Sequence, residues 1–347
     1  MQFIKIYDKD YNELTTLSSE DFTSLSHTNG FGEIGSADFT VMLASDKVNT
    51  TSMRKFNRIE IISDKEVKWS GIILDLKIQL DTAQIRCREL EFILKRRILG
   101  ASYVANDSIA DIAEDILTTI NAVENTGITL GDVSGATGTI NTTFKYANAY
   151  EVLAQITKAS GYQFRVNEAR QLVIASVLGT DLSESVVMKY NQNQISASNI
   201  LQFRVDDNGD NIVTKSLGKS ASLTSAKENA TLKSKFGVLE KFRDFRVANS
   251  QQVLDDFTDA EILGEQYSPQ IDLNPSAPDN FTVGDTVKVV LKNALVDIND
   301  NFQVLEKTVQ YIGTQKRIKV RINELPYDLA KRLADRDSRL DLLEKET

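Results

Sequence analysis

Residues 58–74 read RIEIISDKEVKWSGIIL, in which two apolar runs flank the polar turn Ser63–Glu66. Alternation of apolar and polar residues is the period of a half-buried β-strand. The pattern recurs in three neighbouring runs: Ser36–Leu43, Asp75–Leu80 and Ala83–Leu90. We therefore expect residues 1–100 to form an antiparallel meander that closes into a barrel or sandwich, a first tube-like β-barrel domain.

Residues 101–178 have a different pattern, which predicts a small α/β module. Asp107 can cap a helix whose apolar residues recur at helical spacing: Ile109, Ile112, Ile116, Leu117 and Ile120. Asn148 stands three positions before Glu151, close to a capping box, so a second helix is expected to run to about Ser160 and to stop at Gly161. Two short strands should then form a hairpin: Tyr162–Val166 and Gln171–Ala175.

Residues 179–325 return to strand-like patterns and form the expected second β-barrel region, interrupted by a helix at 250–267. Its later strands are expected at Phe281–Val289, Phe302–Val309 and Arg317–Ile322. Three alternating strands followed by a basic amphipathic turn occur in both strand-rich regions. Either a duplication or the general similarity of β-meanders would explain this internal similarity.

Residues 326–347 are expected to form a C-terminal helix. Its apolar residues fall on alternating steps of four and three, with Arg336 filling the gap: Leu329, Leu333, Leu340 and Leu343. Such a seam is typical of a short coiled coil, which would make these five residues an oligomer interface. A terminal helix packed on its own domain would show the same pattern, and the two interpretations stay open.

The composition is ordinary for a soluble globular chain and disfavours tight nucleic-acid binding. With 347 residues the chain has room for two to four domains, and 41% of its residues are hydrophobic. Its 40 Lys and Arg against 49 Asp and Glu give a net charge of −9, which disfavours tight binding to phosphates. A single cysteine excludes an intrachain disulfide, and without a signal-like segment or a long apolar run we expect synthesis in a cytoplasm.

No motif points to a catalytic, cofactor-binding or metal-binding site. Residues 30–35 match G-x-G-x-x-G, but a strand-like run follows them where a dinucleotide site needs a helix, so a hairpin loop is expected. His27 is the only histidine and is expected to be an exposed or locally bonded loop residue. Asp206–Asp210 and Asp297–Asn301 lack the glycine and glutamate of a calcium loop and are expected to be polar turns.

Three further features receive structural interpretations. Cys87 lies in an alternating run and is expected to be a core or barrel-facing thiol. Trp69 is expected to anchor the packing of the first domain. Residues 95–97, Lys-Arg-Arg, are expected to begin a solvated helix or to face a neighbouring subunit.

The order of these elements resembles the tail hub (baseplate hub, or tail-associated protein) family of long-tailed phages and related injection machines. Three features carry the resemblance: a W-x-G turn at Trp69–Gly71, a helix and hairpin within Ala147–Ala175, and the helix at 250–267 followed by a G-D-x-V turn at Gly284–Val287. The C-terminal helix is similar to the family's exit toward a spike, fibre or lysin. The resemblance covers nearly the whole chain.

The resemblance implies a mainly β fold with an α+β insert and two tail-tube-like antiparallel β-barrel domains. It implies a homotrimer whose six barrels join a six-fold tail tube to a three-fold tip and form part of the DNA-ejection channel. The implied partners are a tail tube or distal tail protein, a tip spike or fibre and a tape-measure protein, in a virion tail assembled in the host cytoplasm. DNA would pass without specific binding, and no cofactor, enzymatic activity or membrane insertion is implied.

Two alternatives from other classes remain at this point. The 49 acidic residues offer many carboxylate pairs, so a tail-associated cell-wall hydrolase is one alternative. A receptor- or carbohydrate-binding tail module is the other, although the sequence offers no aromatic cluster for stacking on sugars.

Overall fold

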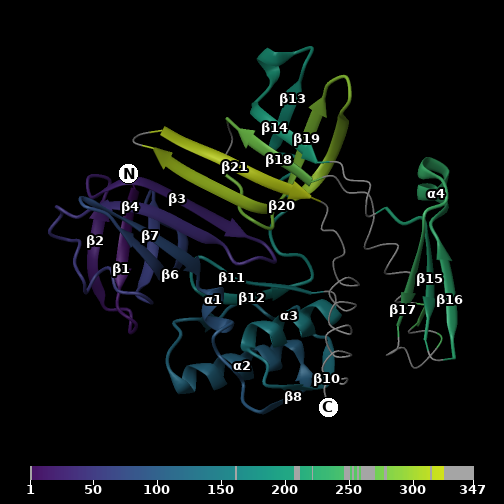
Figure 1. The fold of residues 1–347 in the computed structure, drawn as a ribbon, viewed down its shortest axis with the longest axis horizontal. Coiled ribbons are helices and arrows are strands. Elements are labelled where there is room, and N and C mark those ends of the chain that lie inside the picture. The colour runs from purple at the N-terminus through teal and green to yellow at the C-terminus, as the bar shows by residue number, and fades with distance from the viewer. Residues whose placement is uncertain are drawn as a thin grey trace. The chain divides into compact units, whose positions relative to one another are not determined.

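The structure is a computed structural model that describes residues 2–160, 162–206, 212–220, 222–245, 251, 254–255, 258, 270–276, 280–312 and 315–323 (Figure 1). These residues form two compact units. One unit comprises residues 1–203 and 273–322, and the other contains the described part of 204–272. The chain is mainly β with few helices, as the sequence predicts.

One 13-stranded sheet contains both strand-rich regions. Its early strands are β1 (Gln2–Tyr7), β2 (Glu13–Ser18), β3 (Phe22–Gly30), β4 (Ser36–Met42), β5 (Arg58–Ser63), β6 (Glu66–Ile78) and β7 (Thr82–Glu89). Its late strands are β13 (Val187–Asn191), β14 (Ile200–Asp206), β18 (Gln270–Pro275), β19 (Thr286–Lys292), β20 (Asp297–Ile312) and β21 (Gln315–Asn323). The strands follow the order β14-β18-β21-β20-β3-β4-β7-β6-β5-β1-β2, and β13 pairs with β19, which pairs with β20.

The two strand-rich regions meet at β3 and β20, which lie side by side as antiparallel neighbours (Figure 1). In the first region β5, β6 and β7 form the expected meander, but β4 pairs with β7 and β1 lies between β5 and β2. Among the described residues the pairing of strands does not close a barrel. The internal similarity seen in the sequence corresponds to two three-strand meanders, β5–β7 and β19–β21.

The first region has an apolar core on one face of its sheet. Side chains that alternate along β1, β3, β4, β5, β6 and β7 meet there, together with Val309 and Tyr311 of β20. Trp69 is fully buried in this core, which confirms it as a packing anchor, and Cys87 is a buried thiol as expected. Because β20 contributes to this core, the first region depends on residues nearly 300 positions away in the sequence.

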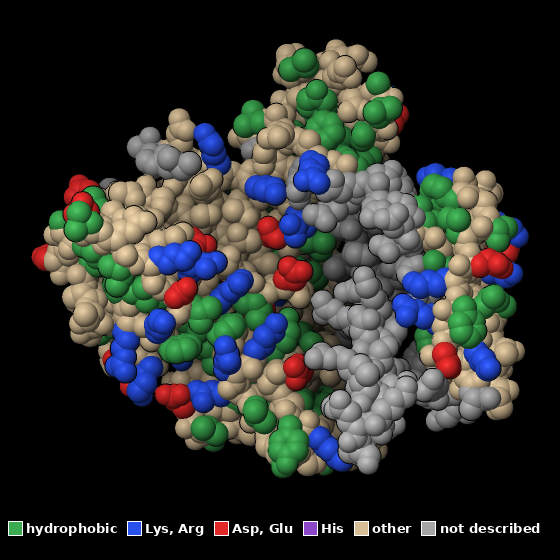
Figure 2. Space-filling view, viewed as in Figure 1, with side chains coloured by type: hydrophobic (Ala, Val, Ile, Leu, Met, Phe, Trp, Pro, Cys, Tyr) green, Lys and Arg blue, Asp and Glu red, His purple; other side chains and the backbone are tan. Residues whose placement is uncertain are grey.

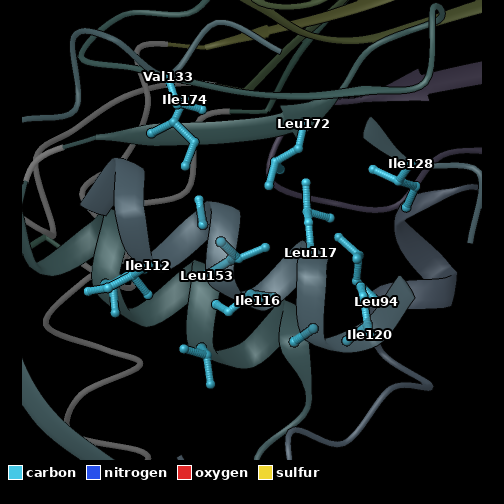
Figure 3. Close-up of a cluster of buried hydrophobic side chains, with 14 of the residues drawn as sticks. Leu94, Ile112, Ile116, Leu117, Ile120, Ile128, Val133, Leu153, Leu172 and Ile174 are labelled. Atoms are coloured by element: carbon cyan, nitrogen blue, oxygen red, sulfur yellow. The ribbon is translucent and has the colours of Figure 1, made fainter. Parts of the chain in front are cut away.

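The α/β module follows the first region. Its elements are α1 (Glu91–Leu94), β8 (Ser102–Ser108), α2 (Ile109–Val123), β9 (Thr129–Leu130), β10 (Thr139–Lys145), α3 (Ala149–Ala159), β11 (Gln163–Val166) and β12 (Gln171–Ala175). All five predicted apolar residues of α2 are buried. Figure 3 shows Ile116, Leu117 and Ile120 of α2 facing the same core as Leu153 of α3, with Leu172 and Ile174 of β12 pointing into it. The predicted helices and hairpin are therefore confirmed.

One local detail of the module differs from its expectation. Ser108, not Asp107, caps α2, because its hydroxyl oxygen accepts from the amide of Asp111 while Asp107 lies in β8. The glycine-rich residues 127–143 include strand β9 and most of β10. The capping box of α3 is present: Asn148 accepts from the Glu151 amide at 2.9 Å, and Glu151 accepts from the Asn148 amide at 3.5 Å.

The second unit contains a small sheet with the order β16-β15-β17. The strands of this sheet are β15 (Lys215–Lys219), β16 (Thr224–Glu228) and β17 (Glu240–Asp244). Helix α4 (Ala230–Phe236), which Asn229 caps, lies between β16 and β17 in the sequence. Of the helix expected at 250–267, Gln251, Leu254, Asp255 and Thr258 are described, in helical conformation, and the rest lies outside the described residues. The 3-10 turn η1 (Ile195–Ala197) belongs to the first unit.

Candidate functional site

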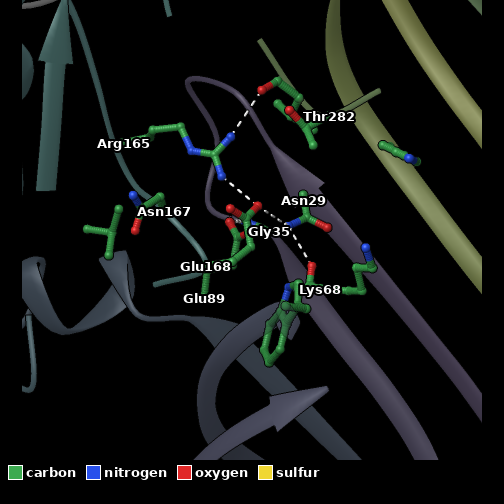
Figure 4. Close-up of polar contacts among 12 residues, drawn as sticks. Asn29, Gly35, Lys68, Glu89, Arg165, Asn167, Glu168 and Thr282 are labelled. Atoms are coloured by element: carbon green, nitrogen blue, oxygen red, sulfur yellow. Dashed lines mark hydrogen bonds and ion pairs between the residues drawn. The ribbon is translucent and has the colours of Figure 1, made fainter. Parts of the chain in front are cut away.

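A polar junction joins the β3–β4 loop, the end of β7, the β11–β12 hairpin and the turn before β19 (Figure 4). Its centre is Arg165 of β11. One terminal nitrogen of the guanidinium donates to the carbonyl oxygen of Val283 at 3.0 Å, and the other to the carboxylate of Glu168 at 2.6 Å. The same Glu168 oxygen accepts from the Asn29 amide at 3.2 Å, and Asn29 also donates to the carbonyl of Lys68 at 3.3 Å. Side chains of the junction therefore connect the first strand-rich region, the α/β module and the segment before β19.

Two buried carboxyl groups complete the junction. Glu89 accepts from the Gly35 amide at 2.6 Å, and Glu91 accepts from the Val166 amide at 2.7 Å. Burial raises the pKa of Glu89 well above its usual range, and the Glu91 charge raises it further. Burial likewise raises the pKa of Glu91 to about 7, although the Val166 amide and the Arg165 charge oppose the shift. These groups hold backbone amides in place, which is a structural task.

The W-x-G motif is not the expected turn: residues 69–71 lie inside strand β6, where they serve the packing of the core. The Trp69 ring lies so close over Gly71 that a Cβ at that glycine would come within 2.3 Å of the ring and 2.2 Å of the Arg88 carbonyl oxygen. The indole N–H donates to the carbonyl of Thr28 at 3.2 Å. The ring thus fastens β6 to β3 across the core, and only glycine leaves it the space.

The G-D-x-V turn is a second structural device. Gly284 has φ +98°, and the buried Asp285 accepts from the amide of Thr180 at 2.8 Å and from the amide of Thr282 at 2.6 Å. Gly179 approaches this turn so closely that a Cβ there would lie 2.3 Å from the carbonyl carbon of Gly284. The aspartate therefore fastens the segment after the module to the entry of β19.

A broad polar face lies on the side of β20, β3, β4 and β7 opposite the apolar core. We call it the polar face, and its side chains are Glu306, Thr308 and Gln310 (β20), Ser24, Ser26 and Thr28 (β3), Ser36, Asp38 and Thr40 (β4), and Gln84, Arg86 and Arg88 (β7). The registers align them in rows, of which one runs Gln310, Ser26, Asp38, Arg86. Hydroxyl groups pair across strands, Thr28 with Thr308 at 2.9 Å and Ser24 with Thr40 at 3.1 Å.

The charges of the polar face are largely balanced. Asp38 lies 3.6 Å from Arg86, and Glu306 lies 3.1 Å from Arg321 of β21. On the side shown in Figure 2, Lys and Arg side chains are spread over many elements between other residues and are not gathered in one basic patch. The side chains of the polar face are therefore short hydroxyl groups, amides and charged groups, two pairs of which offset each other.

The structure places the other residues singled out in the sequence as follows. His27 is not in a loop: it lies inside β3, it is 3% exposed, and burial lowers the pKa of its imidazole to about 4. The loop expectation was wrong because the alternation of β3 continues through residue 27 and turns that side chain to the core. Residues 31–35 do form the expected hairpin loop between β3 and β4.

Two other expectations need correction. Residues 95–97 follow helix α1 and do not begin one, and Arg97 pairs with Glu124 at 2.6 Å. Asp297–Asn301 lies within strand β20, and the turn is at residues 293–296, where Asn293 accepts from the amides of Leu295 and Val296. Residues 207–210 and the expected oligomer-interface residues of the C-terminal helix lie outside the described residues.

The described residues hold no group of three or more His, Cys, Asp or Glu side chains placed to bind a metal ion. None of the helices in the described ranges is both long and apolar enough to cross a bilayer. Sequence reasoning missed Arg165 and the polar face. A signal for the face was present in the hydroxyl residues at every second position of 24–28, whereas Arg165 carries no local signal because its partners are distant in sequence.

Comparisons with known proteins agree with this architecture. No protein-family model matches the chain, and no curated sequence matches it. Among solved structures, the chain is similar to a 43 kDa tail protein of prophage MuSo2 from Shewanella oneidensis, with a TM-score of 0.72, 11% identity and coverage of 94% of this chain and 98% of the other. It is also similar to a tail protein from Neisseria meningitidis MC58, with a TM-score of 0.67, 12% identity and coverage of 93% and 97%.

A third similar structure is the prophage tail protein gp18 from Listeria monocytogenes EGD-e, with a TM-score of 0.62, 16% identity and coverage of 98% and 100%. At these identities the likeness concerns the fold. The chain has the fold of these phage tail proteins over nearly its whole length, which confirms the resemblance seen in the order of its elements.

Proposed function

We propose that the chain is a structural subunit of a phage tail or of a phage-derived injection machine, and that it acts there as the hub. In this role it is not an enzyme. Its two strand-rich regions would present two similar modules per chain, so that three chains offer six to a six-fold tail tube and three to a three-fold tip. The tail-protein fold and the continuous sheet through β3 and β20 support this arrangement of modules.

The polar face is the observation that carries the proposal. A channel for DNA needs walls that stay wet and bind phosphates weakly, because tight phosphate contacts would hold the DNA in place. Short hydroxyl side chains and paired charges give such a wall: Asp38 offsets Arg86, and Glu306 offsets Arg321. We assign the polar face to the lumen of the hub. The net charge of −9 is consistent with weak attraction for DNA.

The C-terminal residues provide the proposed trimer contact. Leu329, Leu333, Arg336, Leu340 and Leu343 would form the seam between three helices, with one polar position. Ring contacts between neighbouring sheets would cover exposed strand edges. The partners proposed for the assembled hub are a tail tube or distal tail protein above it, a spike or fibre below it, and the tape-measure protein inside it. The assembly would form in the host cytoplasm and reside at the tip of the virion tail.

Imaging of labelled particles tests this proposal. Gln84→Cys places a thiol on the exposed margin of the polar face, and Val104→Cys places one on strand β8 of the module as the matched control. Cys87 is buried and should stay unlabelled. After reaction with a maleimide gold cluster, electron microscopy should show a three-lobed ring with gold in the central hole for Gln84→Cys only.

Gold on the outer rim of a ring would overturn the assignment of the polar face. A compact monomeric particle with no ring, even at high protein concentration, would contradict the hub role itself.

A further inference from the structure

A second polar cluster lies where the β1–β2 turn, the start of β5 and the module meet. Tyr11, in that turn, has φ +65°. Its ring packs on Gly127, where a Cβ would lie 2.0 Å from the ring. Two guanidinium groups lie against the same ring: the central carbon of Arg170 is 4.2 Å from the ring centre, and that of Arg58 is 5.8 Å away.

Arg58 is a buried cation that pairs with no carboxylate of the described residues. It is the first residue of β5 and is 6% exposed. Its Nε atom is completely enclosed and has no hydrogen-bond partner. Within the part of the chain that the structure describes, neither Arg58 nor Arg170 forms an ion pair with a carboxylate. A buried charge is costly unless it is paired, so this arrangement is unusual for a purely structural arginine.

The Tyr11 hydroxyl is similarly unsatisfied. It is buried, it lies close to the Arg170 guanidinium, and it forms no hydrogen bond of acceptable geometry. Buried tyrosine hydroxyls normally find a partner. Two guanidinium groups and one buried hydroxyl therefore lie around a single tyrosine ring.

Two of the three nearby acids pair with other cations, and the third, Glu60, bonds to a neutral hydroxyl, which does not offset a charge. Glu124 pairs with Arg97 at 2.6 Å, Glu60 accepts from the Tyr7 hydroxyl at 2.8 Å, and Asp10 pairs with Lys9 at 2.9 Å. The charges of Glu124 and Asp10 still act on Arg58 from a distance, but neither carboxylate contacts it. The cluster thus keeps an excess of positive charge in a chain that is acidic as a whole.

We propose that Arg58, Arg170 and Tyr11 form a binding site for a small oxyanion of the phosphate or carboxylate class. The planar fork of a guanidinium matches two oxygens of such an anion, and the tyrosine hydroxyl can donate to a third contact. The bound anion would contact the terminal nitrogens of Arg58 and Arg170 and offset the charge of the cluster. Since Tyr11 and Arg58 come from the first β region and Arg170 from the module, the anion would also hold these parts together. This site does not depend on the hub proposal.

Thermal unfolding with inorganic phosphate tests the site. Ionic strength is held constant with sodium chloride, so that general screening does not contribute. A saturable rise in Tm is expected for the wild-type chain, by about 5 °C when phosphate exceeds its Kd a hundredfold. Titration calorimetry with phosphate should give one site per chain. Sodium acetate in a parallel series distinguishes a planar carboxylate site from a tetrahedral phosphate site, and a saturable rise with either anion supports the proposal.

Variants locate the effect. Arg58→Gln and Arg170→Gln should lose the saturable rise in Tm, and Tyr11→Phe should weaken binding several-fold while the fold is kept. Arg54→Gln, at an exposed position on the approach to β5, is the matched control and should respond like the wild type. The proposal fails if phosphate and acetate stabilise the wild type no more than sodium chloride does. It also fails if Arg58→Gln and Arg170→Gln still bind the anion as the wild type does.

Discussion

Gly71 and Trp69 act as one unit, because the ring occupies the space that a side chain at residue 71 would need. Gly71→Ala would force the new methyl group against the Arg88 carbonyl oxygen and the Trp69 ring, at 2.2 and 2.3 Å. We expect this substitution to lower the free energy of unfolding by about 3 kcal/mol, the range of overpacked cores. Urea unfolding monitored by Trp69 fluorescence measures the change.

Gly135→Ala is the control for that experiment, since a Cβ at residue 135 meets nothing within 4 Å. Its effect should stay within about 1 kcal/mol. Equal effects of the two substitutions would show that the ring does not need the glycine.

The structural role of Asp285 in its turn depends partly on a residue that is distant in the sequence. Its two carboxylate oxygens accept from the amides of Thr180 and Thr282. Asp285→Ala would leave the backbone amides of Thr180 and Thr282 without acceptors in a partly buried turn, at a cost of about 2–4 kcal/mol. Asp181→Ala is the control, because Asp181 is exposed and accepts from the Ser183 amide next to it, and it should cost no more than about 1 kcal/mol. Chemical denaturation of both variants gives the comparison, and a small loss for Asp285→Ala would refute the fastening role.

The buried carboxyl of Glu91 should make stability depend on pH. Its pKa is raised to about 7 in the folded chain, mainly by burial, and an unfolded glutamate titrates near its usual value of 4.5. The folded state therefore binds the proton more tightly, so the stabilisation is complete below the unfolded pKa and is lost as the pH rises through about 7. Charges facing the group are Glu89 on β7, Arg165 and Glu168 on the hairpin, and Lys95 after α1.

Glu91→Gln keeps an oxygen that can accept from the Val166 amide but removes the charge. Relative to this variant, the wild type should lose about 1–3 kcal/mol between pH 5 and pH 8, and denaturation curves at both pH values measure the difference. Glu114→Gln, at an exposed position of α2, should follow the wild type. If the stability of the wild type and that of Glu91→Gln changed with pH in the same way, the carboxyl group of residue 91 would not have a raised pKa in the folded chain.

At the scale of elements, Asn199 takes the place of a strand pairing. Its side-chain oxygen accepts from the Lys189 amide at 2.6 Å, and its side-chain nitrogen donates to the Val187 carbonyl at 2.7 Å. Its own carbonyl accepts from the Ser276 amide at 2.7 Å. Asn199 thus holds the start of β14 beside β13, although these strands do not pair by a backbone ladder.

Asn199→Ala should therefore loosen this end of the sheet. We expect a loss of about 1–3 kcal/mol from two unmatched backbone groups, and faster hydrogen exchange at residues 187–191. Asn193→Ala, at an exposed position in the following turn, is the control. Unchanged exchange at β13 in Asn199→Ala would show that other contacts hold the strands together.

The sequence predicts elements well where their signals are local. The period of α2, the capping box of Asn148 and the β11–β12 hairpin depend on residues within a few positions of one another, and all three are confirmed. Long-range pairing has no such signal. The antiparallel contact of β3 with β20 joins residues that are about 280 positions apart, as Thr28 and Thr308 are, and no local pattern predicts that partner.

The same contrast holds for the candidate site. The W-x-G and G-D-x-V motifs can be found in the sequence, but their roles depend on Thr28, Arg88 and Thr180, which only the folded chain brings near. His27 was misplaced because its polar side chain suggests a loop, whereas its position in β3 turns it to the core. At the scale of the whole molecule the order of elements was more informative than any motif, since it pointed to the fold that the tail proteins share.

The proposed C-terminal seam would set how three copies assemble. If Leu333 and Leu340 face other copies, the double substitution Leu333→Asp and Leu340→Asp places charges in an apolar seam and should convert a trimer to a monomer. Light scattering coupled to size-exclusion chromatography measures the mass, and circular dichroism checks that the β content is kept. Ser338→Asp, which lies off the seam, should leave the mass unchanged. If the helix instead packs on its own domain, the double variant keeps its mass and loses thermal stability, because the buried leucines would then belong to the core of a single chain.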